Sequence, residues 1–166
     1  GTLAFRSDCV EELAKYIANE INADASKAAR AAHLAKCDLA TTMVTEFTDT
    51  QGIMGMHYAE LDNEDKDVSD AIFEQYLPRF AGDIIPTKPV QISVSLAEKI
   101  ITLVGIFGIN MLPKGDKDPF GLRRAAIGLI RIMIENNISI NFYKLIEKAC
   151  SILEAKLKSK ETIQEN

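Results

Sequence analysis

Two adjacent arginines, Arg123 and Arg124, follow the segment 115–122, which reads GDKDPFGL, and lead into a run of alanines and isoleucines. In a helix, Arg124, Gly128 and Arg131 would fall at i, i+4 and i+7 and would form one ridge. Arg123 would point about 100° away from that ridge. Arginine binds carboxylates and phosphates through the same planar fork of N–H donors. The ridge could therefore be tied to carboxylates inside the protein, or it could be held out to bind phosphates.

Charged side chains also interrupt segments that are otherwise apolar. Lys36 and Asp38 lie in HLAKCDLA, and Glu98 and Lys99 lie in SLAEKII. A buried charge is costly unless it is paired, so we expect these groups in ion pairs. We also expect at least one of the arginines to pair with a carboxylate, the candidates being Asp38, Glu46 and Asp83.

Residue types that serve in catalysis form no recognisable set. The two histidines, His33 and His57, lie 24 residues apart and lack the i, i+4 spacing of two ligands on one helix face. No Ser/His/Asp or Cys/His arrangement and no glycine-rich phosphate loop can be assembled from the sequence. The three cysteines are far apart and odd in number, which indicates a reducing compartment rather than disulfides or a zinc site. We therefore predict no catalytic residue and no metal site in this segment.

The composition bounds the class of protein. The chain has 166 residues, 47% of them apolar and 26% charged, as in a single soluble globular domain. It carries 24 acids against 19 bases, which argues against a free-standing, electrostatically driven nucleic-acid binder. No long apolar run and no signal peptide is apparent, so we expect no membrane segment and a cytoplasmic protein.

Hydrophobic spacing and capping residues predict helices nearly throughout, and no strand pair is apparent. Asp8 with Glu11 fits a capping box for the first helix. Asp118 as N-cap, with Pro119 at the first helical position, marks the start of the helix that carries the arginines. The expected helices span about 8–21, 24–47, 51–61, 68–77, 93–109, 118–135 and 141–158, with an irregular connector at 81–90. We predict an all-α fold, with one compact multi-helix domain over residues 1–159 and a polar tail over 160–166.

Three segments carry specific residue patterns. Segment 27–59 contains Lys-x-Asp-Leu, Met-Val-x-Glu-Phe and Gln-Gly-x-Met-Gly-x-x-Tyr-Ala in succession. Segment 74–86, EQYLPRFAGDIIP, contains Tyr-x-Pro-Arg-x-x-x-Asp, and segment 96–132 contains DKDPFGLRRAA. In type and spacing these patterns resemble the β subunit of the bacterial heterotetrameric glycyl-tRNA synthetase.

The resemblance implies an internal HD-like helical domain of a longer β chain. In that family the β subunit carries tRNA-binding domains, and the α subunit of the α2β2 assembly holds the site for glycine, ATP and Mg2+. The implied partners are glycine tRNA, the α subunit and the rest of the β chain, and no cofactor is expected in this fragment. The domain would lie near the acceptor arm and contact its phosphates and 2′-hydroxyls. The residues expected to make those contacts are Lys114, Lys117, Arg123, Arg124 and Arg131.

The sequence departs from true HD domains, which are metal-dependent phosphohydrolases that hold the metal through histidines and aspartates. It has no His-Asp pair, it reads Lys36-Cys37-Asp38 in the matching neighbourhood, and it has Glu98 where relatives usually have Asp. A residual phosphohydrolase would need its ligands to converge in space, namely His33, Asp38, His57 and Glu98. A structural spacer within the β chain is a further alternative.

Overall fold

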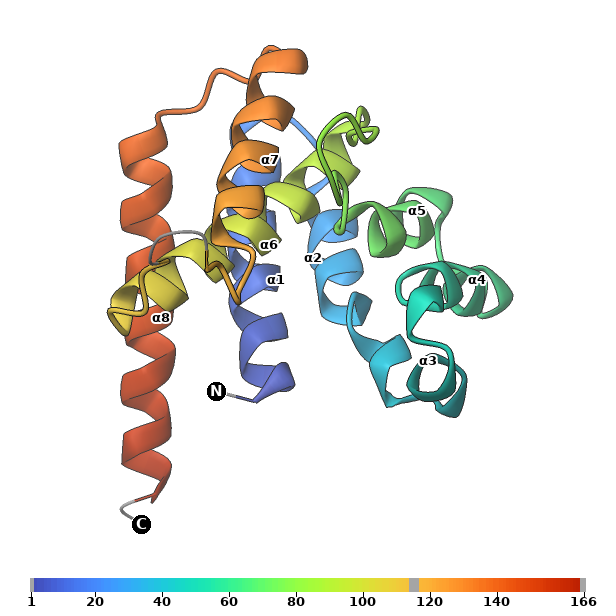
Figure 1. The fold of residues 1–166 in the computed structure, drawn as a ribbon, viewed down its shortest axis with the longest axis horizontal. Helices are drawn as coiled ribbons and strands as arrows, with labels where there is room; N and C mark the ends of the chain where they lie inside the picture. The colour runs from blue at the N-terminus through green and yellow to red at the C-terminus, as the bar shows by residue number, and fades with distance from the viewer. Residues whose placement is uncertain (1, 114–116, 165–166) are drawn as a thin grey trace.

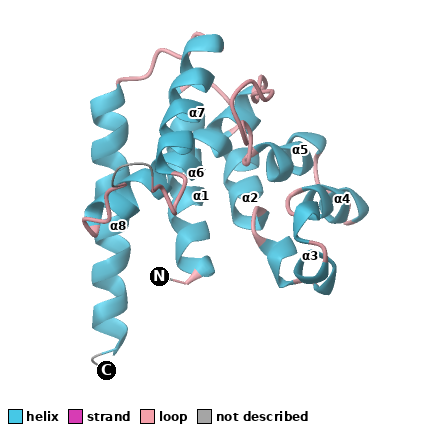
Figure 2. Cartoon of the chain, viewed as in Figure 1, coloured by secondary structure: helices cyan, strands magenta, loops and turns pink. Residues whose placement is uncertain are grey.

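The computed structural model describes residues 2–113 and 117–164. These residues form eight α-helices and two short 3-10 helices, shown in Figure 1 and Figure 2. The α-helices are α1 (Leu3–Glu20), α2 (Ala25–Leu34), α3 (Thr42–Glu46), α4 (Ile53–Leu61), α5 (Lys66–Glu74), α6 (Pro89–Gly108), α7 (Leu122–Glu135) and α8 (Phe142–Gln164). The 3-10 helices are η1 (Cys37–Ala40) and η2 (Thr48–Thr50). The prediction of an all-α fold is confirmed.

Helices α1 and α6 form the centre of the domain. α6 contacts α1, α2, α5, α7 and α8, and α1 also contacts α2 and α8. In Figure 1, α8 runs along one side and α2 to α5 lie on the other, with α1, α6 and α7 between them. Leu13 and Ile17 of α1 and Leu96 and Ile100 of α6 are fully buried. Removing such side chains from water is the main stabilising contribution to a fold of this kind.

By length and composition alone, α6 could cross a membrane. However, 67% of its apolar stretch is buried inside the protein, as in the core helix of a folded domain. Its buried residues include the polar side chains of Gln91, Ser93, Ser95 and Lys99.

The predicted start of the first helix is wrong. α1 begins at Leu3, five residues before Asp8, which lies inside the helix. The cap is Thr2, whose hydroxyl accepts a hydrogen bond from the amide of Phe5 at 3.2 Å. Thr2 is therefore the N-cap of α1, in place of the predicted Asp8.

The predicted start of the arginine helix is also wrong, although the capping residue acts on that helix. α7 begins at Leu122, preceded by Gly121 in the left-handed conformation with φ 65°. Asp118 lies before the turn, and its carboxylate accepts from the amides of Leu122 at 2.8 Å and Arg123 at 2.9 Å. These hydrogen bonds, together with the nearby arginines, hold the pKa of Asp118 below its usual range. The first amides of α7 are therefore satisfied from within the protein.

The single helix expected over 24–47 is divided into α2, η1 and α3. Asp24 caps α2 as expected, by accepting from the amides of Ser26 and Lys27. The interruption buries Asp38, whose Oδ2 accepts from the amide of Gly52 at 2.6 Å. A tertiary hydrogen bond therefore outweighs the local helical preference here.

Two other boundaries differ from the prediction. α6 begins at Pro89 rather than near 93, with proline in its first turn, where the missing amide donor costs nothing. α8 continues to Gln164, so most of the segment expected as a polar tail is helical.

Candidate nucleic-acid interface

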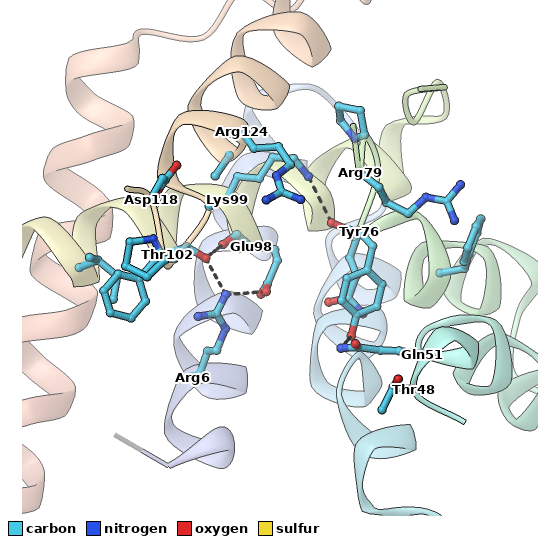
Figure 3. Close-up of a pocket in the computed structure, with 18 of the residues that line it drawn as sticks. Arg6, Thr48, Gln51, Tyr76, Arg79, Glu98, Lys99, Thr102, Asp118 and Arg124 are labelled. Carbon is cyan, nitrogen blue, oxygen red and sulfur yellow. Dashed lines mark hydrogen bonds and ion pairs between the residues drawn. The ribbon is translucent and has the colours of Figure 1, made fainter. Parts of the chain in front are cut away.

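A cleft of about 710 Å³ opens between α1, the end of α5, α6 and the segment that leads into α7. Figure 3 shows its residues: Arg6 reaches Glu98 and Thr102 on one side, while Arg79 and Arg124 lie along the opposite edge. The lining carries acids as well as cations, because Asp49, Glu98 and Asp118 also contribute to it. The cleft is thus polar and mixed in charge rather than a uniformly basic surface.

The Glu98 carboxylate lies between two cations. Its Oε1 is 2.5 Å from Nη2 of Arg6 and 3.2 Å from Nζ of Lys36. Lys36 in turn lies 4.1 Å from the ring centroid of Tyr76, a cation–π contact. Burial raises the pKa of Glu98, but the charges of Lys36 and Arg6 outweigh it and leave the pKa below its usual value. The ion pairing expected for Lys36 and Glu98 is confirmed.

The four candidate metal ligands each meet a different partner. His33 contacts Glu11 at 3.0 Å, and His57 contacts Glu60 at 3.2 Å. Asp38 accepts from a backbone amide, and Glu98 is held by cations. Within residues 2–113 and 117–164, no group of three or more His, Cys, Asp or Glu side chains is arranged to hold a metal ion. The described residues therefore lack the ligand cluster that a residual phosphohydrolase would need.

Lys99 was expected in an ion pair, but it instead bonds to backbone carbonyls and to a serine hydroxyl. Only 6% of it is exposed, and its Nζ donates to the carbonyls of Gln75 at 3.2 Å and Leu77 at 2.6 Å, and to Oγ of Ser95 at 2.9 Å. Burial lowers its pKa from 10.5 to about 8, and the charge of Glu98 opposes this only in part. The ammonium therefore ties the end of α5 to α6.

Gly128 provides the space for this arrangement. A Cβ at Gly128 would lie 3.0 Å from Cε of Lys99 and 3.2 Å from the ring of Pro78. The gap that the sequence places between Arg124 and Arg131 is therefore the point where α7 packs against Lys99 and the segment after α5.

The predicted RNA-contacting residues differ in how the protein holds them. Lys114 lies outside the described residues, and Lys117 is exposed in the segment before α7. Arg123 and Arg124 are both exposed at the start of α7. Arg124 makes no hydrogen bond or ion pair with any described residue. Its charge, together with that of Arg123, contributes to lowering the pKa of Asp118.

Arg131 is anchored, but not in the way that the sequence suggested. Its Nε donates to Glu135 at 2.8 Å and its Nη1 donates to the main-chain carbonyl of Asp83 at 3.1 Å. The carboxylate of Asp83 instead accepts from the backbone amide and Nε of Arg79. Arg131 thus has a carboxylate partner, one turn along its own helix.

Arg124 and Arg131 line a second hollow, of about 350 Å³, that faces the segment 78–81. Arg79 contributes the third guanidinium of this hollow. Sequence reasoning did not select Arg79, although it belongs to the Tyr-x-Pro-Arg pattern. The signal available in the sequence was that this arginine lies between a proline and an aromatic residue, Phe80.

These features define a helical domain that presents arginines from a rigid helix beside a polar cleft, an arrangement suited to binding anions. Residues 1–165 match the family model described as glycyl-tRNA synthetase beta subunit, and the chain belongs to this family. It is 53% identical over 165 residues to the glycine–tRNA ligase beta subunit of Enterobacter sp. (strain 638), covering 99% of this chain and 24% of that protein. It is 54% identical over 157 residues to the corresponding subunit of Klebsiella pneumoniae (strain 342), covering 95% and 23%. The chain therefore spans about a quarter of the length of these curated relatives.

Proposed function

We propose that this domain is an RNA-binding accessory part of a glycine–tRNA ligase β subunit and contacts the acceptor arm of glycine tRNA. In this proposal the α subunit binds glycine, ATP and Mg2+, and aminoacylation takes place there, in the cytoplasm. The domain is HD-like, and its role is to position the tRNA for the α subunit rather than to catalyse a reaction. Its partners are the tRNA, the α subunit and the remainder of the β chain.

The observation that carries the proposal is the state of Arg124. It is exposed, it lines both hollows, and it makes no hydrogen bond or ion pair with a described residue. Arg124 extends from the start of a helix that is packed against the core, so its backbone is already fixed before binding and only its side chain must be ordered. Phosphate is the group in tRNA that such a cation binds, and the contact requires no base sequence.

The test is the salt dependence of binding to an acceptor-stem hairpin of glycine tRNA. Arg124→Ala should weaken binding and reduce the slope of log K against log[salt] by about one, because one phosphate contact is lost. Lys144→Ala is the matched control, since Lys144 is exposed on α8 and lines neither hollow. Thermal unfolding of each variant separates loss of binding from loss of structure.

Arg131→Ala tests whether this arginine serves both the fold and the RNA. Its side chain makes two internal contacts, so this variant should lose some thermal stability as well as RNA affinity. If Arg124→Ala and Lys144→Ala have the same affinity and the same salt slope as wild type, Arg124 does not bind phosphate and the proposal is wrong.

A structural spacer is the second candidate, and one observation favours it. Ile127, Ile130 and Ile134 form an exposed apolar stripe on α7 at helical spacing. Exposed apolar stripes of this kind are commonly covered by another part of an assembly. Absence of RNA binding by wild type, both alone and in the assembled enzyme, would leave the spacer as the better description.

A further inference from the structure

We propose that the hollow between segment 78–81 and α7 binds an unpaired nucleotide of the acceptor end, with its base against Phe80 and its phosphate on Arg124 and Arg131. We call this hollow the Phe80 groove; its α7 wall consists of Arg124, Ile127, Gly128 and Arg131. The inference rests on the proposed function and deepens it by naming the part of the RNA that this site takes.

The walls of the Phe80 groove are apolar and partly aromatic. Phe80 on one wall and Ile127 on the other are each 59% exposed, although both are large apolar side chains. Gly128 closes the base of the groove, where α7 packs against Pro78, and Ala81 adds only a small side chain to the opposite wall. The resulting volume, about 350 Å³, lies in the range of small-ligand sites. The groove therefore offers an exposed aromatic ring and an exposed aliphatic side chain to a ligand.

Three guanidinium groups surround this apolar space. Arg79 is held by Asp83 through its Nε at 3.0 Å, and its guanidinium carbon lies 5.8 Å from the ring centroid of Phe80. Arg131 is held by Glu135 and by the carbonyl of Asp83. An arginine has five N–H donors, so both residues retain donors beyond those bonded to described residues. Arg124 keeps all of its donors with respect to those residues.

A cationic rim around an aromatic wall matches single-stranded RNA better than duplex RNA. A duplex stacks its bases inside and presents phosphates and sugars, which would use the arginines but would offer no base to stack on Phe80. An unpaired nucleotide presents a base that can stack on an aromatic ring and a phosphate that can bind arginine. The amides of Leu122 and Arg123 at the start of α7 are already bonded to Asp118, so the arginine side chains are the donors that the groove offers to a phosphate. The unpaired part of an acceptor arm is its 3′ strand.

The first arm of the test measures affinity with the assembled enzyme, containing the α and full-length β chains. Two hairpins are compared, one with the unpaired 3′ strand and one with a blunt end. Phe80→Ala should weaken binding of the hairpin with the 3′ strand by about fivefold to a hundredfold, the usual range for one lost stacking contact. The blunt hairpin should bind this variant as it binds wild type. Phe80→Tyr keeps an aromatic ring and should retain the affinity.

The second arm locates the nucleotide, because the α subunit could also bind the 3′ strand. A photoreactive 4-thiouridine in that strand should crosslink to residues in segment 78–81 or on the α7 wall. Phe80→Ala should abolish this crosslink and Phe80→Tyr should retain it. The matched control is Ile84→Ala, an exposed apolar residue in the same connector that does not line the groove.

Three outcomes would overturn the inference. If wild type binds both hairpins equally and Phe80→Ala affects neither, the groove takes no nucleotide but the proposed RNA-binding function stands. If Phe80→Ala instead separates the α and β chains in size-exclusion chromatography, the groove is a protein contact. If wild type binds neither hairpin, the proposed function fails together with the inference.

Discussion

Because Lys99 is buried, we predict that the free energy of unfolding of this protein rises with pH above neutrality. Its pKa is about 8 in the folded protein, against an ordinary value of 10.5, because the ammonium is buried. At a pH between these two pKa values, Lys99 carries a proton in the unfolded chain but has lost it in the folded protein. Raising the pH therefore favours the folded state. Each unit of pKa difference corresponds to about 1.4 kcal/mol, so the contribution grows by about 2.5 kcal/mol between pH 7 and pH 10.

The measurement is urea unfolding of wild type and Lys99→Met across that pH range. Subtracting the two free energies of unfolding removes the titration of other groups that the substitution leaves unchanged. The stability of wild type relative to Lys99→Met should rise with pH. Lys144→Met is the control, because Lys144 is exposed and its substitution should give a difference that does not change with pH. A flat or falling difference for Lys99→Met would refute the argument that burial lowers the pKa of this lysine.

Two further substitutions test the packing and the start of α7. Gly128→Ala should be less stable than Gly105→Ala by about 1–3 kcal/mol, because the Cβ added at Gly128 would lie 3.0 Å from Lys99 and 3.2 Å from Pro78. Gly105→Ala, where a Cβ would meet open space, is its control, and equal stability of the two variants would contradict the packing argument. Asp118→Ala should lower the free energy of unfolding at neutral pH, because two capping hydrogen bonds are lost. Because the folded pKa of Asp118 is lowered, its contribution should disappear as the pH falls below about 4. Persistence of the difference in strong acid would show that the carboxylate charge does not matter.

The local features of this protein could be read from the sequence because they depend on residues close together in the chain. The helical period placed Arg124, Gly128 and Arg131 on one ridge of α7, and these three residues do line one wall of the Phe80 groove. The Asp24 cap and the helix near 51–61 also follow from neighbouring residues. The specific patterns around DKDPFGLRRAA were enough to indicate the family, which the comparison of residues 1–165 confirms.

The sequence could not predict which charges are paired, because the partners lie far apart in the chain. Glu98 meets Arg6, 92 residues away, and Arg131 meets the carbonyl of Asp83, 48 residues away. The break after α2 likewise depends on the distant amide of Gly52. The sequence by itself determined the all-α class, the family and the arginine ridge, since helical period and specific patterns are local. Only the tertiary structure decided that the Lys99 ammonium bonds to backbone carbonyls, that Arg79 lines the same hollow as Arg124 and Arg131, and that Arg124 makes no hydrogen bond to a described residue. The physical reason is that pairing depends on contacts that the chain makes only after it has folded.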